Sequence, residues 1–456
     1  MSHRRVAHLL VLTSLAVGTP ACSSGPRATV RAEVDQRDLP GALEAYERVR
    51  AMDGADPALL RDVAALVLQQ AVEGEDLAVR DAALSQLRRA RERAHRTLRR
   101  LADSPDEAVR AAALELQAAA GDTLAVAQLR ASLDSTDQAA RASAQSALDP
   151  QHAGDLAHLR GSLTDPSARV RRAAALRLRL AAEDDDTRVD LELVTRVDPA
   201  LTVRVTALSA LARQGEPAFA PLRERLHDPE PSVRMAALLA LAVCDATRAA
   251  GIYQGFLATP PSSDSVEAAR LLATRVPAGA AGTDPSSEDA LARTRATEYL
   301  LAALTAPDES LRAQTAVALS SLPALYVAGS DDDTPRLQRA LAAQLERETV
   351  RQTRLVLAQT LLRASDDTVG RAALGDLLTG DDVPAVMAAA ALARLGDEAA
   401  LTRLDAALQD PRATHRRIAA AALTWDAGDP DRARAALEDE DAFVRVAAAG
   451  GVLSAR

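Results

Sequence analysis

Residue types that could carry out chemistry are sparse and scattered in this sequence. Past the N-terminal segment, the histidines are His95, His152, His158, His227 and His415. Their positions show no zinc-ligand spacing. There is no Gly-x-Ser-x-Gly motif, and a chain without lysine cannot form a phosphate-binding loop that needs one. The aspartate runs at 184–186 and 331–333 lack the alternating pattern of a calcium loop. We therefore expect no catalytic residue, no metal and no cofactor.

Arginine, by contrast, recurs regularly. The recurring residues are Arg80, Arg110, Arg141, Arg171, Arg204, Arg234, Arg312, Arg351, Arg416 and Arg445. The first six follow one another at steps of 30 to 33 residues. Several come after an Asp-Pro pair, as in Asp228-Pro229 before Val233-Arg234. Because proline cannot continue a helix and the apolar residues that follow have helical spacing, each copy predicts a turn and then an amphipathic helix.

Partner helices are predicted between these copies. Segments that begin with glycine and carry leucine at spaced positions occupy 121–133, 154–163, 215–226 and 396–408. Degenerate copies at Val266-Glu267 and Val386-Met387 raise the number of units to twelve. We predict twelve stacked helical hairpins, which form one extended array.

These turns and Val-Arg helices resemble the HEAT-repeat superfamily, in the short bacterial form also seen in phycobilin lyases. The resemblance covers Leu77 to the C-terminus and implies an all-α solenoid whose Val-Arg helices line the concave side. It also implies a structural arginine ladder, in which each arginine pairs with a neighbouring aspartate or carbonyl group. The ladder residues are Arg110, Arg141, Arg171, Arg204 and Arg234. Deoxyhypusine hydroxylases, which share this repeat, bind iron through His-Glu pairs, and the sequence contains none.

The N-terminal segment has the layout of an export signal. Arg4 and Arg5 precede an apolar run at 6–17, which is too short to span a bilayer. We divide the chain into a signal peptide (1–21), a short tether (22–28), an N-terminal helical cap resembling a tetratricopeptide hairpin (29–72) and the repeat array (73–456). The array carries loop inserts near 276–289 and 323–336, which are rich in Gly, Pro and Ser.

Cys22 lies where the export signal ends. The segment 19–25 resembles the processing site of bacterial lipoproteins, in which a small residue such as Ala21 precedes the lipidated cysteine. This implies an exported protein of the cell envelope, anchored to a membrane through Cys22 and facing the periplasm. Plain secretion after cleavage at Ala21 is the alternative.

Composition narrows the choice of partner. Hydrophobic residues make up 48% of the 456 residues and aromatic residues 2%, which predicts closely packed helices with small side chains. The formal net charge of −10 disfavours nucleic acid, whose binding rests on phosphate neutralisation. One basic segment, 88–100, is interpreted as a solvated helix surface, and contact with anionic lipid headgroups is its alternative.

A helical wheel of the Val-Arg helices suggests where a partner binds. Positions three, seven and ten, counted from the buried valine, point away from the core. The candidate groove consists of Arg172, Leu176, Arg179, Val205, Met235 and Leu239. We expect a non-enzymatic scaffold that binds a protein or peptide along a superhelical surface. Two alternatives stay open: neighbouring helices cover these side chains, or the chain is a lyase or chromophore-binding component resembling phycobilin lyases.

Overall fold

The computed structural model describes residues 25–274, 287–322, 333–365 and 368–455. Within these ranges the chain forms helices and turns and no strand, which confirms the all-α class and the stacked hairpins. The predicted signal peptide, Cys22 and most of both predicted inserts lie outside the described residues. No helix of the described chain combines the length and apolar character needed to cross a membrane.

Twelve helices form an inner layer, and they are the predicted Val-Arg helices. They are α4 (Leu77–Ala90), α6 (Glu107–Ala119), α8 (Gln138–Ala144), α10 (Ala168–Leu178), α12 (Leu201–Leu211), α14 (Pro231–Cys244), α16 (Ser263–Thr274), α18 (Glu309–Ser320), α20 (Arg351–Ser365), α22 (Val383–Ala393), α24 (Ala413–Trp425) and α25 (Ala442–Ser454). Each packs against the next along the chain. Aspartates cap several of them, as Asp106 accepts from the backbone amides at the start of α6.

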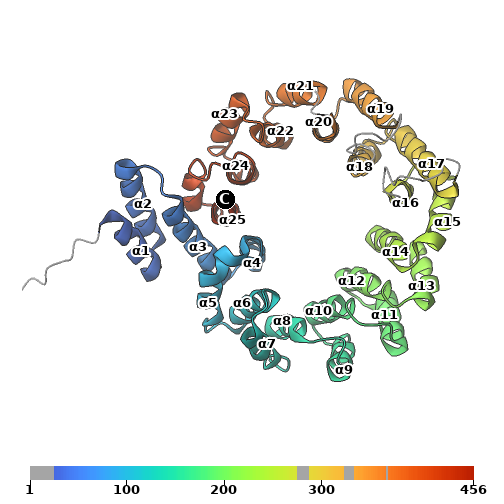
Figure 1. The fold of residues 1–456 in the computed structure, drawn as a ribbon, viewed down its shortest axis with the longest axis horizontal. Helices are drawn as coiled ribbons and strands as arrows, with labels where there is room; N and C mark the ends of the chain where they lie inside the picture. The colour runs from blue at the N-terminus through green and yellow to red at the C-terminus, as the bar shows by residue number, and fades with distance from the viewer. Residues whose placement is uncertain (1–24, 275–286, 323–332, 366–367, 456) are drawn as a thin grey trace, which may run out of the picture.

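The connecting helices form an outer layer (Figure 1). They are α5 (His95–Ala102), α7 (Thr123–Arg130), α9 (Ala153–Ser162), α11 (Asp185–Val197), α13 (Phe219–Glu224), α15 (Ala246–Phe256), α17 (Glu288–Ala303), α19 (Asp333–Arg347), α21 (Thr368–Leu377) and α23 (Glu398–Ala407), with the 3-10 helix η6 (Arg434–Glu438) before α25. Helices α17 and α19 begin within the C-terminal parts of the predicted inserts.

The array closes into a ring, which differs from the predicted extended superhelix (Figure 1). The last helix, α25, packs against α24 on one side and against α3 (Pro57–Glu73) and α4 on the other. The ends of the array thus bury each other's apolar sides, so the predicted solvated N-terminal cap is not needed. We call this junction the seam.

Two further helices precede the ring wall. Helices α1 (Pro26–Gln36) and α2 (Leu39–Asp53) pack against each other and against α3. Figure 1 shows them outside the circle formed by the inner layer. Helix α1 begins at Pro26, inside the segment predicted as a tether, because proline is well suited to the first turn of a helix.

Close approach at the seam depends on two glycines of α25. A Cβ atom on Gly450 would lie 2.4 Å from the Gln86 side chain of α4, and one on Gly451 would lie 1.8 Å from Thr424 of α24. Real Cβ contacts are essentially never this short, so a larger residue at Gly450 would displace the Gln86 side chain and one at Gly451 would displace Thr424.

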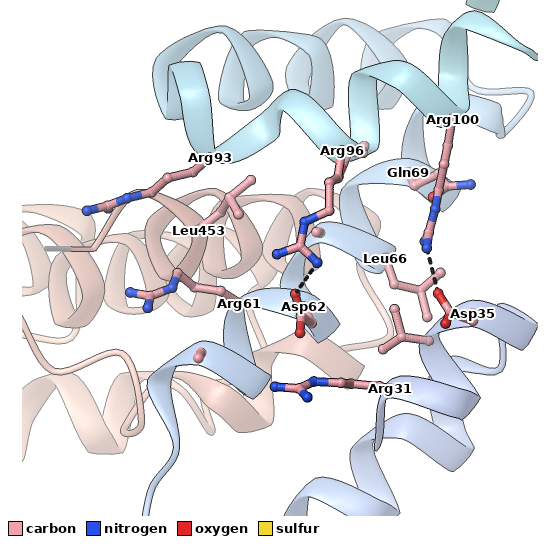
Figure 2. Close-up of a pocket in the computed structure, with 14 residues that line it drawn as sticks. Arg31, Asp35, Arg61, Asp62, Leu66, Gln69, Arg93, Arg96, Arg100 and Leu453 are labelled. Carbon is pink, nitrogen blue, oxygen red and sulfur yellow. Dashed lines mark hydrogen bonds and ion pairs between the residues drawn. The ribbon is translucent and has the colours of Figure 1, made fainter. Parts of the chain in front are cut away.

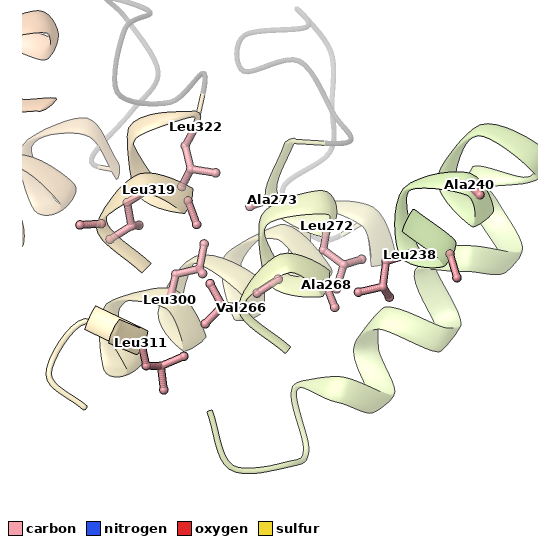
Figure 3. Packing of buried hydrophobic residues seen from close by; sticks show 14 of the residues in the cluster. Leu238, Ala240, Val266, Ala268, Leu272, Ala273, Leu300, Leu311, Leu319 and Leu322 are labelled. Atoms are coloured by element: carbon pink, nitrogen blue, oxygen red, sulfur yellow. The ribbon is translucent and has the colours of Figure 1, made fainter. Parts of the chain in front are cut away.

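The hydrophobic core follows the ring. One large cluster runs from Leu148 to Ala433, and Figure 3 shows part of it, where Leu238, Leu272 and Leu300 interlock between successive units. A second cluster joins α1 to α6 with α24 and α25 across the seam. Because Val452 and Leu453 are fully buried there, the seam is packed like any other junction between units.

Candidate functional site

The ladder arginines all make the same contact at the start of their helices. Each donates from Nη1 to the carbonyl oxygen six residues earlier, in the turn that precedes its own helix. These distances are 2.6 Å for Arg110, 2.8 Å for Arg141, 2.9 Å for Arg171, and 3.0 Å for both Arg204 and Arg234. The contact ties each inner helix to its turn.

Three of the five also reach a carboxylate of the following unit. Nε of Arg141 lies 3.2 Å from Asp165. The equivalent distance is 2.7 Å from Arg171 to Asp198 and 2.7 Å from Arg234 to Asp264. Guanidinium groups held by a carbonyl and a carboxylate link consecutive units.

The ladder is incomplete at two positions. Among the described residues, Arg110 and Arg204 reach no carboxylate in this way, and Nε of Arg204 is buried without a hydrogen-bond partner. At the contact between Arg171 and Asp198, burial alone would raise the pKa of the Asp198 carboxyl group. Hydrogen bonds from Arg171 and from the amide of Ala200 outweigh it and lower that pKa.

One group of side chains has the proximity of a metal site. Ligand atoms of Asp381, Asp410 and His415 lie within 4.8 Å of one another. Arg412 already occupies this place, because its Nη2 lies 2.5 Å from Asp381 and 2.8 Å from Asp410. This hydrogen bonding lowers the pKa of Asp410. The cluster is therefore an ion-pair network whose cation is an arginine.

The inner face of the ring is the surface formed by the sides of the inner helices that face its centre. Between α4 and α10 this face carries exposed charged side chains. Arg169 of α10 lies 3.9 Å from Asp81 of α4, so their side chains reach across α6 and α8. On the helices between them, Glu115 of α6 lies 3.5 Å from Arg88 and accepts a hydrogen bond from Ser143 at 2.9 Å. This arc leaves little apolar surface for a partner.

The predicted groove residues lie on the next three inner helices, α10, α12 and α14. Leu176 is 49% exposed and Leu239 is 43% exposed, while Met235 is half-buried. Val205 is half-buried and packs on the core. Arg172 and Arg179 of α10 are exposed. We call these six residues the inner patch; exposed Val243 extends it along α14.

A second apolar site lies on the inner layer at α20, α22 and α24. A cavity of about 560 Å³ is lined there by apolar side chains that include Leu362, Met387 and Ile418. Arg363 and Arg394 also line it. We call this cavity the inner groove.

Reasoning from the sequence missed the inner groove. The helical wheel selects residues of α10, α12 and α14, where the Val-Arg pattern is clear. In α22 the pattern is degenerate, with Met387 in place of an arginine. The available signal was a set of apolar residues on one side of α22, followed by exposed Leu395 in the turn after the helix.

No family model matches the sequence, and no curated protein matches it either. Several solved structures are similar to it in part. The Escherichia coli protein YibA is 16% identical, over 67% of this chain and 91% of YibA, with a TM-score of 0.28. Kap121p is 14% identical over 93% of this chain, with a TM-score of 0.40, and yeast importin-beta (Kap95p) is 13% identical over 92%, with a TM-score of 0.37.

The chain covers 62% of the matched Kap121p chain and 60% of the Kap95p chain. At these TM-scores the similarities carry no argument about this chain. The chain has a HEAT-like repeat fold, formed by its own twelve units.

Proposed function

We propose that this protein is a non-enzymatic scaffold whose inner face binds a segment of another protein. The observation that carries the proposal is the exposure of Leu176 and Leu239 beside arginines on the inner patch. Contiguous exposed apolar side chains tend to mark interaction sites, and Met235 and Met387 add side chains that adapt to varied partners.

The charges indicate the chemistry of the bound segment. Arg172 of α10 and Arg179, which directly follows this helix, flank Leu176, and neither has an ion pair with another described residue. A segment with apolar side chains and nearby aspartate or glutamate would match this pattern, because acidic groups pair with the free guanidiniums while apolar groups cover the leucines.

The proposal includes an address in the cell envelope, where lipidation of Cys22 anchors the protein. Support comes from the export signal and the processing-site pattern in the sequence. Helix α1 begins at Pro26, so only a few residues would separate the lipid from the folded chain. The ring would then lie close to the membrane.

Site-specific crosslinking tests the proposal. A photoreactive residue at Leu239 faces the centre of the ring, while one at Val189 lies on outer helix α11, where it is 54% exposed. We expect crosslinked polypeptide from position 239 and not from position 189 in native envelope membranes. Equal crosslinking from both positions would contradict an inner-face site.

A further inference from the structure

A charged cavity lies at the seam, apart from the inner face. It has a volume of about 440 Å³ and lies where α1, α3, the 3-10 helix η1 (Arg91–Ala94), α5 and the C-terminal helix α25 meet (Figure 2). The charged residues that line it are Arg31, Asp35, Arg61, Asp62, Arg93, Arg96 and Arg100. Five arginines against two aspartates leave an excess of positive charge, in a chain whose net charge is −10. We call this cavity the seam pocket.

Most of the guanidinium donors in the seam pocket are not used. Arg100 donates to Asp35 at 2.6 Å, and Arg93 donates to the backbone carbonyl of Ser454 at 2.7 Å. Neither Arg31 nor Arg61 lies within ion-pair distance of a described carboxylate. A guanidinium carries five N–H donors, so the pocket retains a large surplus of donors over the acceptors that its two carboxylates supply.

The central carboxylate of the pocket is weakly held. Asp62 is 26% exposed, and its contact with Arg96 is 3.8 Å long, which exceeds a hydrogen bond. Figure 2 shows Arg31, Arg61 and Arg96 around it. Burial raises the pKa of Asp62, although the four nearby arginines oppose this effect. The arginines are thus incompletely neutralised from within the chain.

The break between α4 and α5 aims these arginines at the pocket. Arg91 has a φ of 51°, a left-handed conformation that ends α4 and redirects the chain into η1. As a result Arg93, Arg96 and Arg100 line the seam pocket, while Arg88 lines a different cavity between α4 and α6. The arginines of the basic segment 88–100 are exposed, as the sequence suggested, and they are spread over α4, η1 and α5 with some of them at each of two cavities.

We propose that the seam pocket binds a phosphate group, presented either by a soluble phosphorylated compound or by an anionic phospholipid headgroup. Arginine forks match the oxygens of phosphate in geometry and charge, and here they converge from four elements. Leu453 also lines the pocket, so a bound phosphate joins the N-terminal helices to the C-terminal helix and stabilises the closed ring. This inference does not depend on what binds the inner face.

Calorimetric titration of the full chain with inorganic pyrophosphate tests the proposal. We expect binding together with a rise in melting temperature. Arg61→Gln should weaken binding about tenfold or more, because it removes a charged donor. The matched control is Arg371→Gln on outer helix α21, an exposed arginine far from the pocket, which should leave binding unchanged. Absence of binding to the wild-type chain, or equal loss in both variants, would overturn the proposal.

Asp62→Asn should change pyrophosphate binding in the direction opposite to Arg61→Gln. Removal of the internal carboxylate should strengthen pyrophosphate binding, whereas a variant that merely damaged the fold would weaken it. Weaker binding by a folded Asp62→Asn protein would contradict the assigned role.

Vesicles of phosphatidylglycerol, compared with vesicles of phosphatidylcholine, identify the source of the phosphate. Arg61-dependent binding to phosphatidylglycerol that pyrophosphate displaces assigns the pocket to the lipid headgroup, whereas a chain that binds pyrophosphate and neither kind of vesicle assigns it to soluble phosphate.

Discussion

Arg50 and Asp431 form an ion pair across the seam although 381 residues separate them in the sequence. Nε of Arg50 lies 2.9 Å from one carboxylate oxygen of Asp431 and 3.1 Å from the other. Nearby, Arg434 donates to Glu47 at 2.7 Å, so each end of the chain supplies one cation and one anion. Two reciprocal pairs beside a shared core fix how the ends meet.

The seam should be sensitive to side-chain volume at Gly450. Because a Cβ there would meet Gln86 at 2.4 Å, Gly450→Val should lower the free energy of unfolding by about 1–3 kcal/mol beyond the cost of valine in a helix. Gly251→Val in α15 is the matched control, since nothing lies within 4 Å of a Cβ at that position. Urea unfolding measures both, and equal losses would argue against close packing of α25.

Ala237 tests the packing between ordinary units. It is fully buried on α14, so Ala237→Glu should cost several kcal/mol by overpacking the junction and burying an unpaired charge. Ala302→Glu, at an exposed position of α17, should have little effect. An unchanged melting curve for Ala237→Glu would refute the position of this residue in the core.

Acid should weaken the ion pair between Arg312 and Glu348. The hydrogen bond from Arg312, at 2.8 Å, is the main reason why the pKa of Glu348 is lowered to about 2. A lowered pKa stabilises the folded state above the unfolded pKa of 4.5, and this stabilisation disappears as the pH falls towards 2. At about 1.4 kcal/mol per pKa unit, the effect is at most about 3–4 kcal/mol. Unfolding measured from pH 5 to 2 should show a shallower pH dependence for Glu348→Gln than for wild type.

Leu239→Asp should separate binding from folding. Because Leu239 is exposed on the inner face, the free energy of unfolding of the variant should stay within about 1 kcal/mol of the wild-type value. The variant should nevertheless lose partner capture. Val189→Asp on α11 should retain capture. If Leu239→Asp unfolds the protein, the side chain belongs to the core and the partner binds elsewhere.

A substitution at Cys22 tests the proposed location at a membrane of the cell envelope. Cys22→Ser should move the mature protein from the membrane fraction to the soluble fraction, because a lipid anchor is lost. Immunoblots of fractionated cells measure the partition. If the wild-type protein and the variant partition alike, simple secretion is the better account.

Local structure was readable from the sequence because each unit repeats it. The Asp-Pro turn and the Val-Arg pair recur often enough to predict all twelve inner helices, including α16 and α22 from degenerate copies. Each such signal depends on residues close together in the chain, as when Arg234 binds the carbonyl of Asp228.

Ring closure was not readable in this way. It results from small rotations summed over twelve units, and no single repeat encodes that sum. The contacts that complete it, such as Gly450 against Gln86, join residues that show no pattern in the sequence. The seam pocket was missed for the same reason, because Arg61 and Arg93 come together only when α3 and η1 meet at the seam.

The distance between the two ends of the array tests ring closure most directly. Spin labels at Arg48→Cys on α2 and Ala435→Cys on η6, in a chain whose native cysteines are replaced, flank the contact between Glu47 and Arg434. The closed ring predicts one narrow distribution at short distance in a double electron–electron resonance measurement. An open superhelix of twelve units at helix spacings of about 8–10 Å would place the labels about 100 Å apart, and a distribution without the short distance would contradict the ring.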